Sequence, residues 1–213
     1  MLMKGKRVII TGSNRGIGRA ILEVFAENGA DIWAHSRTDT MGFREDIKKL
    51  SENYGVEIIP LFFDLTDSTA IKAAIRTVMQ SKIAVDALVN NAGITYNALF
   101  QMSTEAILRE QFDVNFFSPF LFTQYVSKLM VRQKSGSIVN VASTAAFDGN
   151  SGKSVYGATK AALVAMTHSL ATELGSHNIR ANCIAPGITN TEMLSSMPAN
   201  VIEAANNSSD LGR

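Results

Sequence analysis

A glycine-rich segment near the amino terminus, TGSNRGIG at residues 11–18, constrains the fold of this chain more than any other feature. The apolar run KRVII before it is typical of a buried strand, and RAILEVFAENG after it has apolar residues at helical spacing. A helix that follows such a turn directs free N–H groups and the positive end of its dipole at a bound phosphate. The order strand, glycine turn, helix therefore predicts a dinucleotide site, with a loop that binds no ligand as the alternative.

The three glycines of this turn have separate expected roles. Gly12 permits the tight turn, Gly16 lets the backbone approach a pyrophosphate, and Gly18 lets helix and strand pack closely. The spacing is GxxxGxG rather than the more common GxGxxG. The residues expected to bind the cofactor here are Gly12, Ser13, Asn14, Arg15, Gly16, Ile17 and Gly18.

Strand-like and helix-like segments alternate along the chain, which predicts an α/β fold with a Rossmann-type doubly wound parallel sheet in a single domain, 1–213. We expect Asp67 to cap a helix and Pro119 to kink or break one. The expected strands are 7–11, 30–36, 56–63, 85–90, 136–142 and 179–184. The expected helices are 16–28, 42–54, 68–80, 104–133 and 155–175.

The bulk composition argues against several functions. The chain has 20 Lys and Arg against 19 Asp and Glu, so nothing electrostatic favours nucleic acid or an anionic membrane. No segment approaches the roughly 18 apolar residues of a membrane span, and the first apolar run is too short for a signal peptide. Its three histidines show no metal-ligand spacing, and its single cysteine excludes an intrachain disulfide. We expect a cytoplasmic protein without a metal.

A second informative group of residues lies around the segment YGATK. Tyr156 and Lys160 are four residues apart, so they share one face of the expected helix. A neighbouring ammonium favours phenolate, which predicts a pKa of Tyr156 below its usual value of about 10 and proton exchange near neutral pH. Ser143, after the apolar run SIVNVA, can supply a hydroxyl to the same oxygen. Taken singly, each of these residues is more often structural, but the glycine turn makes a joint catalytic role the better interpretation.

TGSNRGIG, NNAG at 90–93, Asn115, Ser143, YGATK and PG at 186–187 together resemble the short-chain dehydrogenase/reductase family, most closely its bacterial 3-oxoacyl-[acyl-carrier-protein] reductases. The resemblance covers the whole chain and implies that Asn115, Ser143, Tyr156 and Lys160 are catalytic. Tyr156 would donate a proton to a substrate carbonyl, and Ser143 would stabilise the same oxygen. Lys160 would also hold the nicotinamide ribose, and Asn115 would bind a water that links Lys160 to solvent.

Two arginines favour NADP(H) over NAD(H). Arg37 follows the second expected strand, where an NAD enzyme has an acidic residue for the adenosine ribose. A guanidinium matches a 2′-phosphate in charge and geometry, and Arg15 in the glycine turn adds a second one. Asp31 lies at the opposite end of that strand, too far away to bind the ribose. Two solvated surface arginines are the alternative.

The resemblance implies further cofactor contacts at the carboxyl ends of the strands. Asp64 would face the adenine, although its carboxylate could instead cap the next turn. Asn91 would support both the strand and the cofactor, and Thr191 would lie near the carboxamide. The expected contacts beyond the glycine turn are Arg37, Asp64, Leu65, Asn91, Ala92, Gly93, Tyr156, Lys160, Pro186, Gly187, Ile188 and Thr191.

The resemblance also implies an activity, the NADPH-dependent reduction of a 3-oxoacyl thioester to a secondary alcohol. Ala145, Ala146 and Phe147 suggest an apolar wall for an acyl chain, and basic residues at 128–134 could contact an acyl carrier protein. Open alternatives are another small ketone, a sugar or a steroid as substrate, a non-catalytic NADP(H)-binding subunit, or an inactive fragment.

Two further expectations concern the tail and the assembly. By resemblance, 190–213 is a mobile substrate loop, and the chain is truncated before the last helix and strand of the family. Helices 104–133 and 155–175 would form a homodimer face, with a homotetramer as the alternative.

Overall fold

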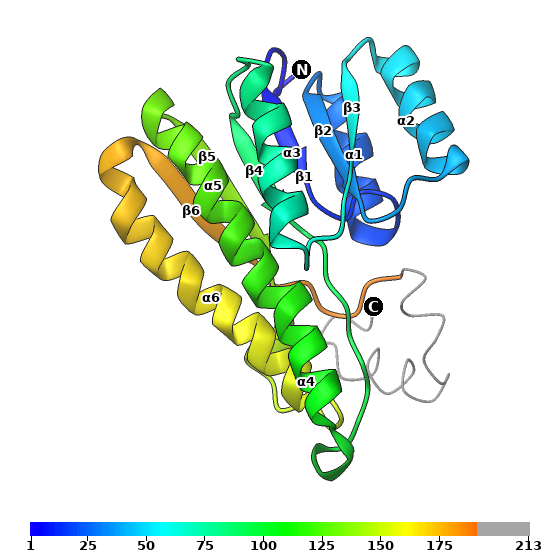
Figure 1. The fold of residues 1–213 in the computed structure, drawn as a ribbon, viewed down its shortest axis with the longest axis vertical. Helices are drawn as coiled ribbons and strands as arrows, with labels where there is room; N and C mark the ends of the chain where they lie inside the picture. Colours follow the sequence, from blue (N-terminus) through cyan, green and yellow to red (C-terminus); the bar gives the residue numbers. More distant parts are fainter. Residues whose placement is uncertain (191–213) are drawn as a thin grey trace.

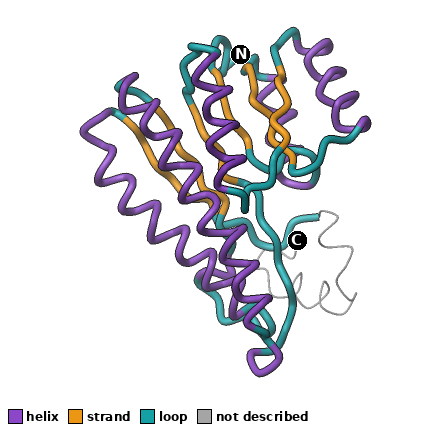
Figure 2. The backbone as a smooth tube through the Cα atoms, in the orientation of Figure 1, coloured by secondary structure: helices purple, strands orange, loops and turns teal. Residues whose placement is uncertain are grey.

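The computed structural model of the protein describes residues 1–190, which form a six-stranded parallel sheet between two layers of helices (Figures 1 and 2). The strand order is β3-β2-β1-β4-β5-β6. The order reverses between β1 and β4, which confirms the predicted doubly wound sheet and marks the point where such sheets bind ligands. The strands are β1 (Arg7–Ile10), β2 (Asp31–Ser36), β3 (Ile58–Phe62), β4 (Ala87–Asn90), β5 (Gly136–Val141) and β6 (Ile179–Ile184).

Two hydrophobic clusters hold the helices on opposite faces of the sheet. One cluster packs α3 (Ser68–Gln80), α5 (Ser118–Gln133) and the end of α6 (Ser154–Leu174) against one face. The other packs α1 (Gly16–Glu27) and α2 (Met41–Tyr54) against the opposite face. Burial on both faces explains why the strands read as apolar runs rather than as alternating patterns. No described helix is long and apolar enough to cross a membrane.

The expected fourth helix is divided, as Pro119 predicted. It consists of α4 (Glu105–Phe112), a π-helical turn (Asp113–Phe117) and α5, with Pro119 in the first turn of α5. A proline cannot donate a hydrogen bond to the carbonyl four residues earlier, which here belongs to Asn115. The break therefore places Asn115 in the π-helical turn, a feature that often occurs at functional sites. The predicted N-cap is also confirmed, since Asp67 accepts hydrogen bonds from two N–H groups of α3.

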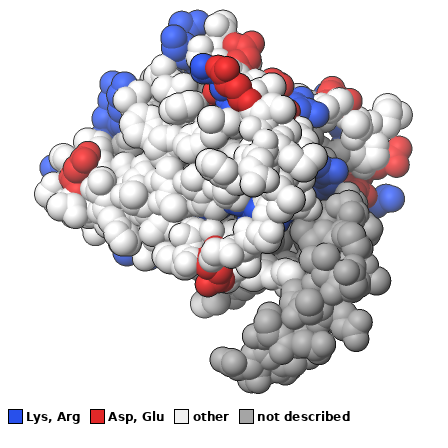
Figure 3. Space-filling view, turned by 90° about the horizontal axis from the view of Figure 1, so that it is seen from below, with Lys and Arg blue, Asp and Glu red and all other residues white. Residues whose placement is uncertain are grey.

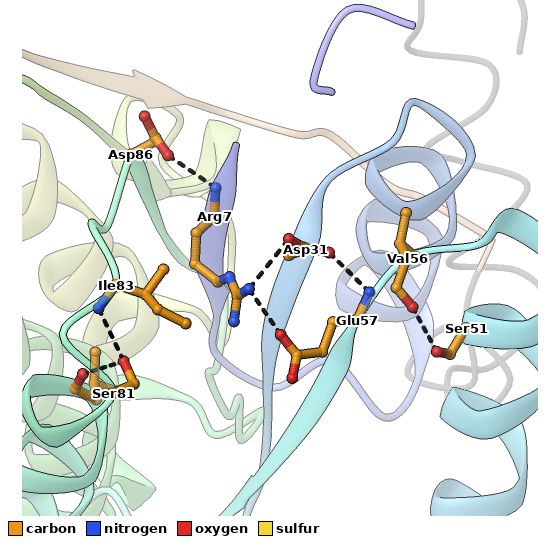
Figure 4. A network of polar contacts seen from close by, with 9 residues as sticks. Arg7, Asp31, Ser51, Val56, Glu57, Ser81, Ile83 and Asp86 are labelled. Carbon is orange, nitrogen blue, oxygen red and sulfur yellow. Dashed lines mark hydrogen bonds and ion pairs between the residues drawn. The ribbon is translucent and has the colours of Figure 1, made fainter. Parts of the chain in front are cut away.

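A buried arginine joins the first three strands at their amino ends (Figure 4). The side chain of Arg7 is 8% exposed and forms ion pairs with Asp31 at 3.1 Å and Glu57 at 2.8 Å. Its backbone N–H donates to Asp86 at 2.9 Å, just before β4. Asp31 is thus committed to the end of β2 that is remote from the glycine turn, as the sequence predicted.

Candidate active site

The glycine turn between β1 and α1 is shaped by two close approaches. Gly12 has a φ of +64° and Gly16 a φ of +53°, a region that glycine adopts without strain. A Cβ on Gly12 would lie 2.9 Å from the Cα of Ala92, and one on Gly18 would lie 2.0 Å from the carbonyl oxygen of Gly12. Larger residues would push the turn away from the sheet and from the start of α1. Because the first N–H groups of a helix lack intrahelical acceptors, this cradle fits the pyrophosphate of a dinucleotide.

Buried polar side chains hold this turn in place. The amide of Asn91 donates to the carbonyls of Thr11 and Gly12, both at 3.0 Å. The N–H of Gly12 donates to Nδ1 of His35 at 3.1 Å, while Nε2 of His35 lies 2.9 Å from the carbonyl of Phe63. A carbonyl can only accept, so Nε2 carries the proton and the imidazole is neutral. Burial lowers the pKa of His35 to about 4, in agreement with this assignment.

A cavity of about 360 Å³ lies beside the end of β2, where the adenosine was expected. Both Arg37 and Asp64 line it. One oxygen of Asp64 accepts from the N–H and the hydroxyl of Thr66, each at 2.8 Å, and these bonds lower the pKa of Asp64. Asp64 therefore caps the next turn, the alternative left open by the sequence, and still faces the cavity. The lining residues are Arg37, Asp64, Thr66, Ala106, Arg109, Glu110, Asp113 and Val114.

The predicted tyrosine and lysine lie on one face of α6, near the end of β5. Lys160 is buried, its ammonium donates to the carbonyl of Val141 at 2.8 Å, and it lies 5.7 Å from the centroid of the Tyr156 ring. The hydroxyl of Ser143 caps the short helix η3 (Thr144–Ala146) and lies close enough to the phenol of Tyr156 to act on its pKa. Three of the four expected catalytic residues thus meet at the carboxyl end of the sheet.

The expected lowering of the tyrosine pKa was wrong. Burial raises the pKa of Tyr156, and the hydrogen bond with Ser143 opposes this rise only in part. Lys160 does not reverse the shift because its ammonium is directed at the carbonyl of Val141 rather than at the phenol. Burial also lowers the pKa of Lys160, to about 8.

Asn115 is buried beside these residues. Its side-chain oxygen accepts from the N–H of Ile94 at 2.8 Å, and its amide donates to the carbonyl of Ile94 and to the hydroxyl of Thr159. A Cβ on Gly93 would lie 3.2 Å from the side-chain oxygen of Asn115 and 3.4 Å from Nζ of Lys160. Gly93 thus marks the point where the fourth expected catalytic residue comes close to the lysine. Asn115 ties the loop after β4 to helix α6.

The segment after β6 returns to the same place. The N–H of Thr144 donates to the carbonyl of Pro186 at 3.1 Å, so the expected nicotinamide-side residues lie next to the turn that carries Ser143. A second cavity of about 400 Å³ lies between α1 and residues 189–190. The prediction for Thr191, and that for the substrate loop beyond Asn190, fall outside the described residues.

Sequence reasoning missed two residues of this site. His35 was treated only as context for Arg37, although a polar residue at the end of an apolar strand is a signal in its own right. Lys153 was not considered, although it precedes Tyr156 by three residues and therefore shares its helix face. Its Nζ lies 5.2 Å from the centroid of the Tyr156 ring.

A doubly wound sheet with a glycine cradle at its switch point defines a nucleotide-binding α/β protein. The short-chain dehydrogenase family matches residues 6–201. The chain is 37% identical over 213 residues to the 3-oxoacyl-[acyl-carrier-protein] reductase FabG of Thermotoga maritima. This match covers 100% of the present chain and 86% of FabG. It is also 37% identical over 216 residues to a 3alpha-hydroxysteroid dehydrogenase of Mediterraneibacter gnavus, in a match that covers 100% of this chain and 85% of that protein. The protein belongs to the short-chain dehydrogenase family and is an oxidoreductase.

Solved structures agree with this assignment. A proposed NAD(P)-dependent gluconate 5-dehydrogenase from Beutenbergia cavernae, with NADP bound at low occupancy, superposes with a TM-score of 0.92 at 29% identity. That match covers 99% of this chain and 84% of the other. A mutant short-chain dehydrogenase/reductase from Serratia marcescens gives a TM-score of 0.91 at 26% identity, over 100% and 86% of the two chains.

Proposed function

We propose that the protein is an NADPH-dependent reductase that converts a ketone to a secondary alcohol. The first candidate substrate is a 3-oxoacyl thioester. The observation that carries this proposal is the phenol of Tyr156, which lies near the hydroxyl of Ser143 and is followed one helical turn later by the buried ammonium of Lys160. A protein that only bound a nucleotide would have no need of this arrangement. Perturbed titratable groups gathered at a ligand-binding edge are typical of catalytic sites.

The proposed chemistry is a balanced two-electron reduction. The nicotinamide, when bound, supplies the hydride that adds to the carbonyl carbon. Tyr156 donates its proton to the carbonyl oxygen, and its raised pKa keeps that proton in place until negative charge develops on the substrate. Ser143 donates a hydrogen bond to the same oxygen. The ammonium of Lys160 stabilises the phenolate that remains, and Tyr156 regains a proton from solvent before the next turnover.

The charge at the end of β2 supports NADPH over NADH as the cofactor. Arg37 is exposed and lines the cavity beside β2, and it stands directly after β2, where an acidic residue would repel a 2′-phosphate. Asp31, the acidic residue of that strand, forms an ion pair with Arg7 at the opposite end. We propose that the glycine turn and the residues named after β2, β3, β4 and β6 hold the cofactor.

An apolar rim beside the site supports an acyl substrate. Phe100 and Met102 are strongly exposed in η1 (Phe100–Met102), and Phe147 is exposed after η3. The loop that precedes η1 contacts the loop before α6, where the N–H of Ala98 donates to the carbonyl of Gly152 at 3.1 Å. The face seen in Figure 3 has a broad uncharged area, with charged side chains mainly toward its edges. A steroid ketone is the second candidate, because the 3alpha-hydroxysteroid dehydrogenase is as similar to this chain as FabG is.

We further propose that the protein forms a homodimer through α4 and α5. Three apolar side chains are exposed along this region, Leu108, Phe117 and Phe120. Sedimentation of the wild-type protein beside a Phe120→Glu variant tests this. A dimer that the substitution converts to monomer supports the face, and an unchanged dimer places the interface elsewhere.

The direct test of the proposed function is oxidation of NADPH with an acetoacetyl thioester, run beside NADH and beside a steroid ketone. We expect turnover with the thioester and a higher kcat/KM for NADPH than for NADH. Intact NADPH binding without reduction of any ketone would contradict the proposal and favour a nucleotide-binding subunit. Reduction of the steroid alone would move the assignment to the second candidate.

A further inference from the structure

A fully buried threonine stands between the tyrosine and the lysine of the site. Thr159 lies on α6, directly before Lys160 and three residues after Tyr156. Its hydroxyl donates to the backbone carbonyl of Tyr156 at 2.7 Å, and the side-chain amide of Asn115 donates to the same hydroxyl at 3.1 Å. A hydroxyl has one proton, and here the carbonyl takes it. Thr159 therefore offers Asn115 an acceptor and not a donor.

This acceptor fixes the orientation of the Asn115 amide. With Nδ2 directed at Thr159, Oδ1 accepts from the N–H of Ile94 at 2.8 Å, and Nδ2 also donates to the carbonyl of Ile94 at 2.9 Å. A reversed amide would place its oxygen against two acceptors and its NH₂ group against a donor, so all three hydrogen bonds would be lost. The hydroxyl of Thr159 thus favours the orientation in which Asn115 holds the loop after β4.

The loop held in this way passes directly beside the lysine of the site. A Cβ on Gly93, the residue before Ile94, would lie 3.2 Å from Oδ1 of Asn115 and 3.4 Å from Nζ of Lys160. The backbone of Gly93 is therefore close to both side chains. Gly93 is among the residues expected to contact the cofactor, so the position of this loop against α6 would set the distance between the bound cofactor and the phenol of Tyr156.

We propose that Thr159 is a positioning residue, which acts through Asn115 to align the loop at 91–95 with the face of α6 that carries Tyr156 and Lys160. The inference rests on the proposed function, which assigns the ketone oxygen to Tyr156 and a cofactor contact to this loop. Thr159 and Asn115 are both fully buried, so bulk water cannot easily replace the hydrogen bond between them. Without the hydroxyl, one N–H of Asn115 is left unpaired and the loop is held less firmly.

The test compares Thr159→Val, which removes the hydroxyl at nearly constant shape, with Thr159→Ser, which keeps it. Amide hydrogen exchange of a peptide covering 92–96 reports the N–H of Ile94 and requires no activity. We expect Thr159→Val to speed this exchange roughly tenfold and Thr159→Ser to leave it near the wild-type rate. Peptides from α2, which packs on the opposite face of the sheet, should keep their wild-type rates.

Thr172→Val is the matched control for these variants. It removes an exposed hydroxyl from the same helix, where Thr172 donates to the carbonyl of His168 at 3.2 Å. Neither the exchange at 92–96 nor the activity should change. In an Asn115→Ala background, Thr159→Val should no longer affect the exchange at 92–96, because its effect passes through Asn115.

Activity separates a positioning role from a merely structural one. The kcat for reduction of an acetoacetyl thioester by NADPH should fall roughly tenfold or more in Thr159→Val, since small displacements of reacting groups are costly, and should recover in Thr159→Ser. Three results would overturn the inference. They are unchanged exchange at 92–96 or full kcat in Thr159→Val, an equal acceleration of exchange in α2, and a Thr159→Ser protein as impaired as Thr159→Val.

A wild-type protein that reduces no ketone would contradict the proposed function rather than this inference. The affinity for NADPH then takes the place of kcat. Thr159→Val should weaken it roughly fivefold or more, together with the faster exchange at 92–96, and Thr159→Ser should preserve it. An unchanged affinity in Thr159→Val would overturn the positioning role as well.

Discussion

The two ends of the sheet differ in the partners of their buried cations. At the amino ends, the guanidinium of Arg7 is paired with the carboxylates of Asp31 and Glu57 (Figure 4). At the carboxyl ends, the ammonium of Lys160 is more deeply buried and donates to a backbone carbonyl, and Lys153 donates to a hydroxyl. Counter-charges stabilise the fold at one end, whereas at the other end the hydrogen-bond acceptors of Lys160 and Lys153 among the described residues are neutral.

This difference separates structure from function. Removing one partner of a buried ion pair leaves the other charge without a counter-charge in an environment that solvates it poorly, and this destabilises the protein. A buried cation without an anion already lowers stability, so its removal should cost the fold little. Arrangements that lower the stability of the fold are expected where the activity requires them. The predictions below test this contrast, from the largest expected effect to the smallest.

The largest effect is expected for Tyr156→Phe. This variant keeps the ring but loses the proton that the proposed mechanism transfers, so kcat should fall roughly 10³-fold or more. Its melting temperature and its affinity for NADPH should stay near the wild-type values. Steady-state kinetics and fluorescence titration measure the two quantities. A kcat within a factor of about ten of the wild type would remove Tyr156 from the role of proton donor.

Arg7→Met should destabilise the fold without changing the chemistry. Asp31 and Glu57 lose their shared partner, and we expect the free energy of unfolding to fall by about 3 kcal/mol. Urea denaturation measures this loss. Lys48→Met, at an exposed lysine that lies 3.8 Å from Glu52, is the matched control and should cost less than about 1 kcal/mol. Similar losses in the two variants would show that burial of the arginine is unimportant.

His35 should make stability depend on pH in acid. Its pKa in the folded protein is about 4, below the unfolded value of 6.5, so the unfolded chain binds more protons between these limits. The contribution is complete above pH 6.5 and is lost as the pH falls toward 4, up to about 3 kcal/mol in total. Urea titrations across this range should show the slope, and His35→Gln should reduce it. An unchanged slope in the variant would assign the acid sensitivity to other groups.

The smallest of these effects concerns the cofactor. Arg37→Gln should raise the Kd for NADPH by roughly tenfold and leave the Kd for NADH nearly unchanged, because only NADPH carries the 2′-phosphate. Arg76→Gln, at an exposed arginine on α3, is the control. If Arg37→Gln weakens both cofactors equally, the argument for NADP(H) from this position fails.

The sequence predicted most of the fold because its signals are local. Apolar runs and helical periodicity located each strand and each α-helix of the described region, with α4 and α5 predicted as one stretch that Pro119 divides near Asn115, whereas the short helices η1, η3 and η4 were not predicted. The order of the strands required the resemblance or the structure, since pairing between distant segments leaves no local pattern.

The site was predicted less completely, because charge and direction depend on tertiary packing. The spacing of Tyr156 and Lys160 predicted that they share a helix face. It could not predict that the ammonium of Lys160 donates to the carbonyl of Val141 rather than to the phenol. The dominance of burial over charge in the tyrosine pKa could not be read from a motif. For the same reason, the contact between His35 and Gly12 appears only when two segments meet in space.

The measurement that tests the central contrast most directly compares Lys160→Met with Arg7→Met in one set of assays. Each variant is unfolded in urea and assayed for reduction of an acetoacetyl thioester by NADPH. We predict that Arg7→Met loses stability and keeps its kcat, whereas Lys160→Met loses its kcat and unfolds at the wild-type urea concentration or above it. A Lys160→Met protein that is as unstable as Arg7→Met, or one that retains full kcat, would contradict the account.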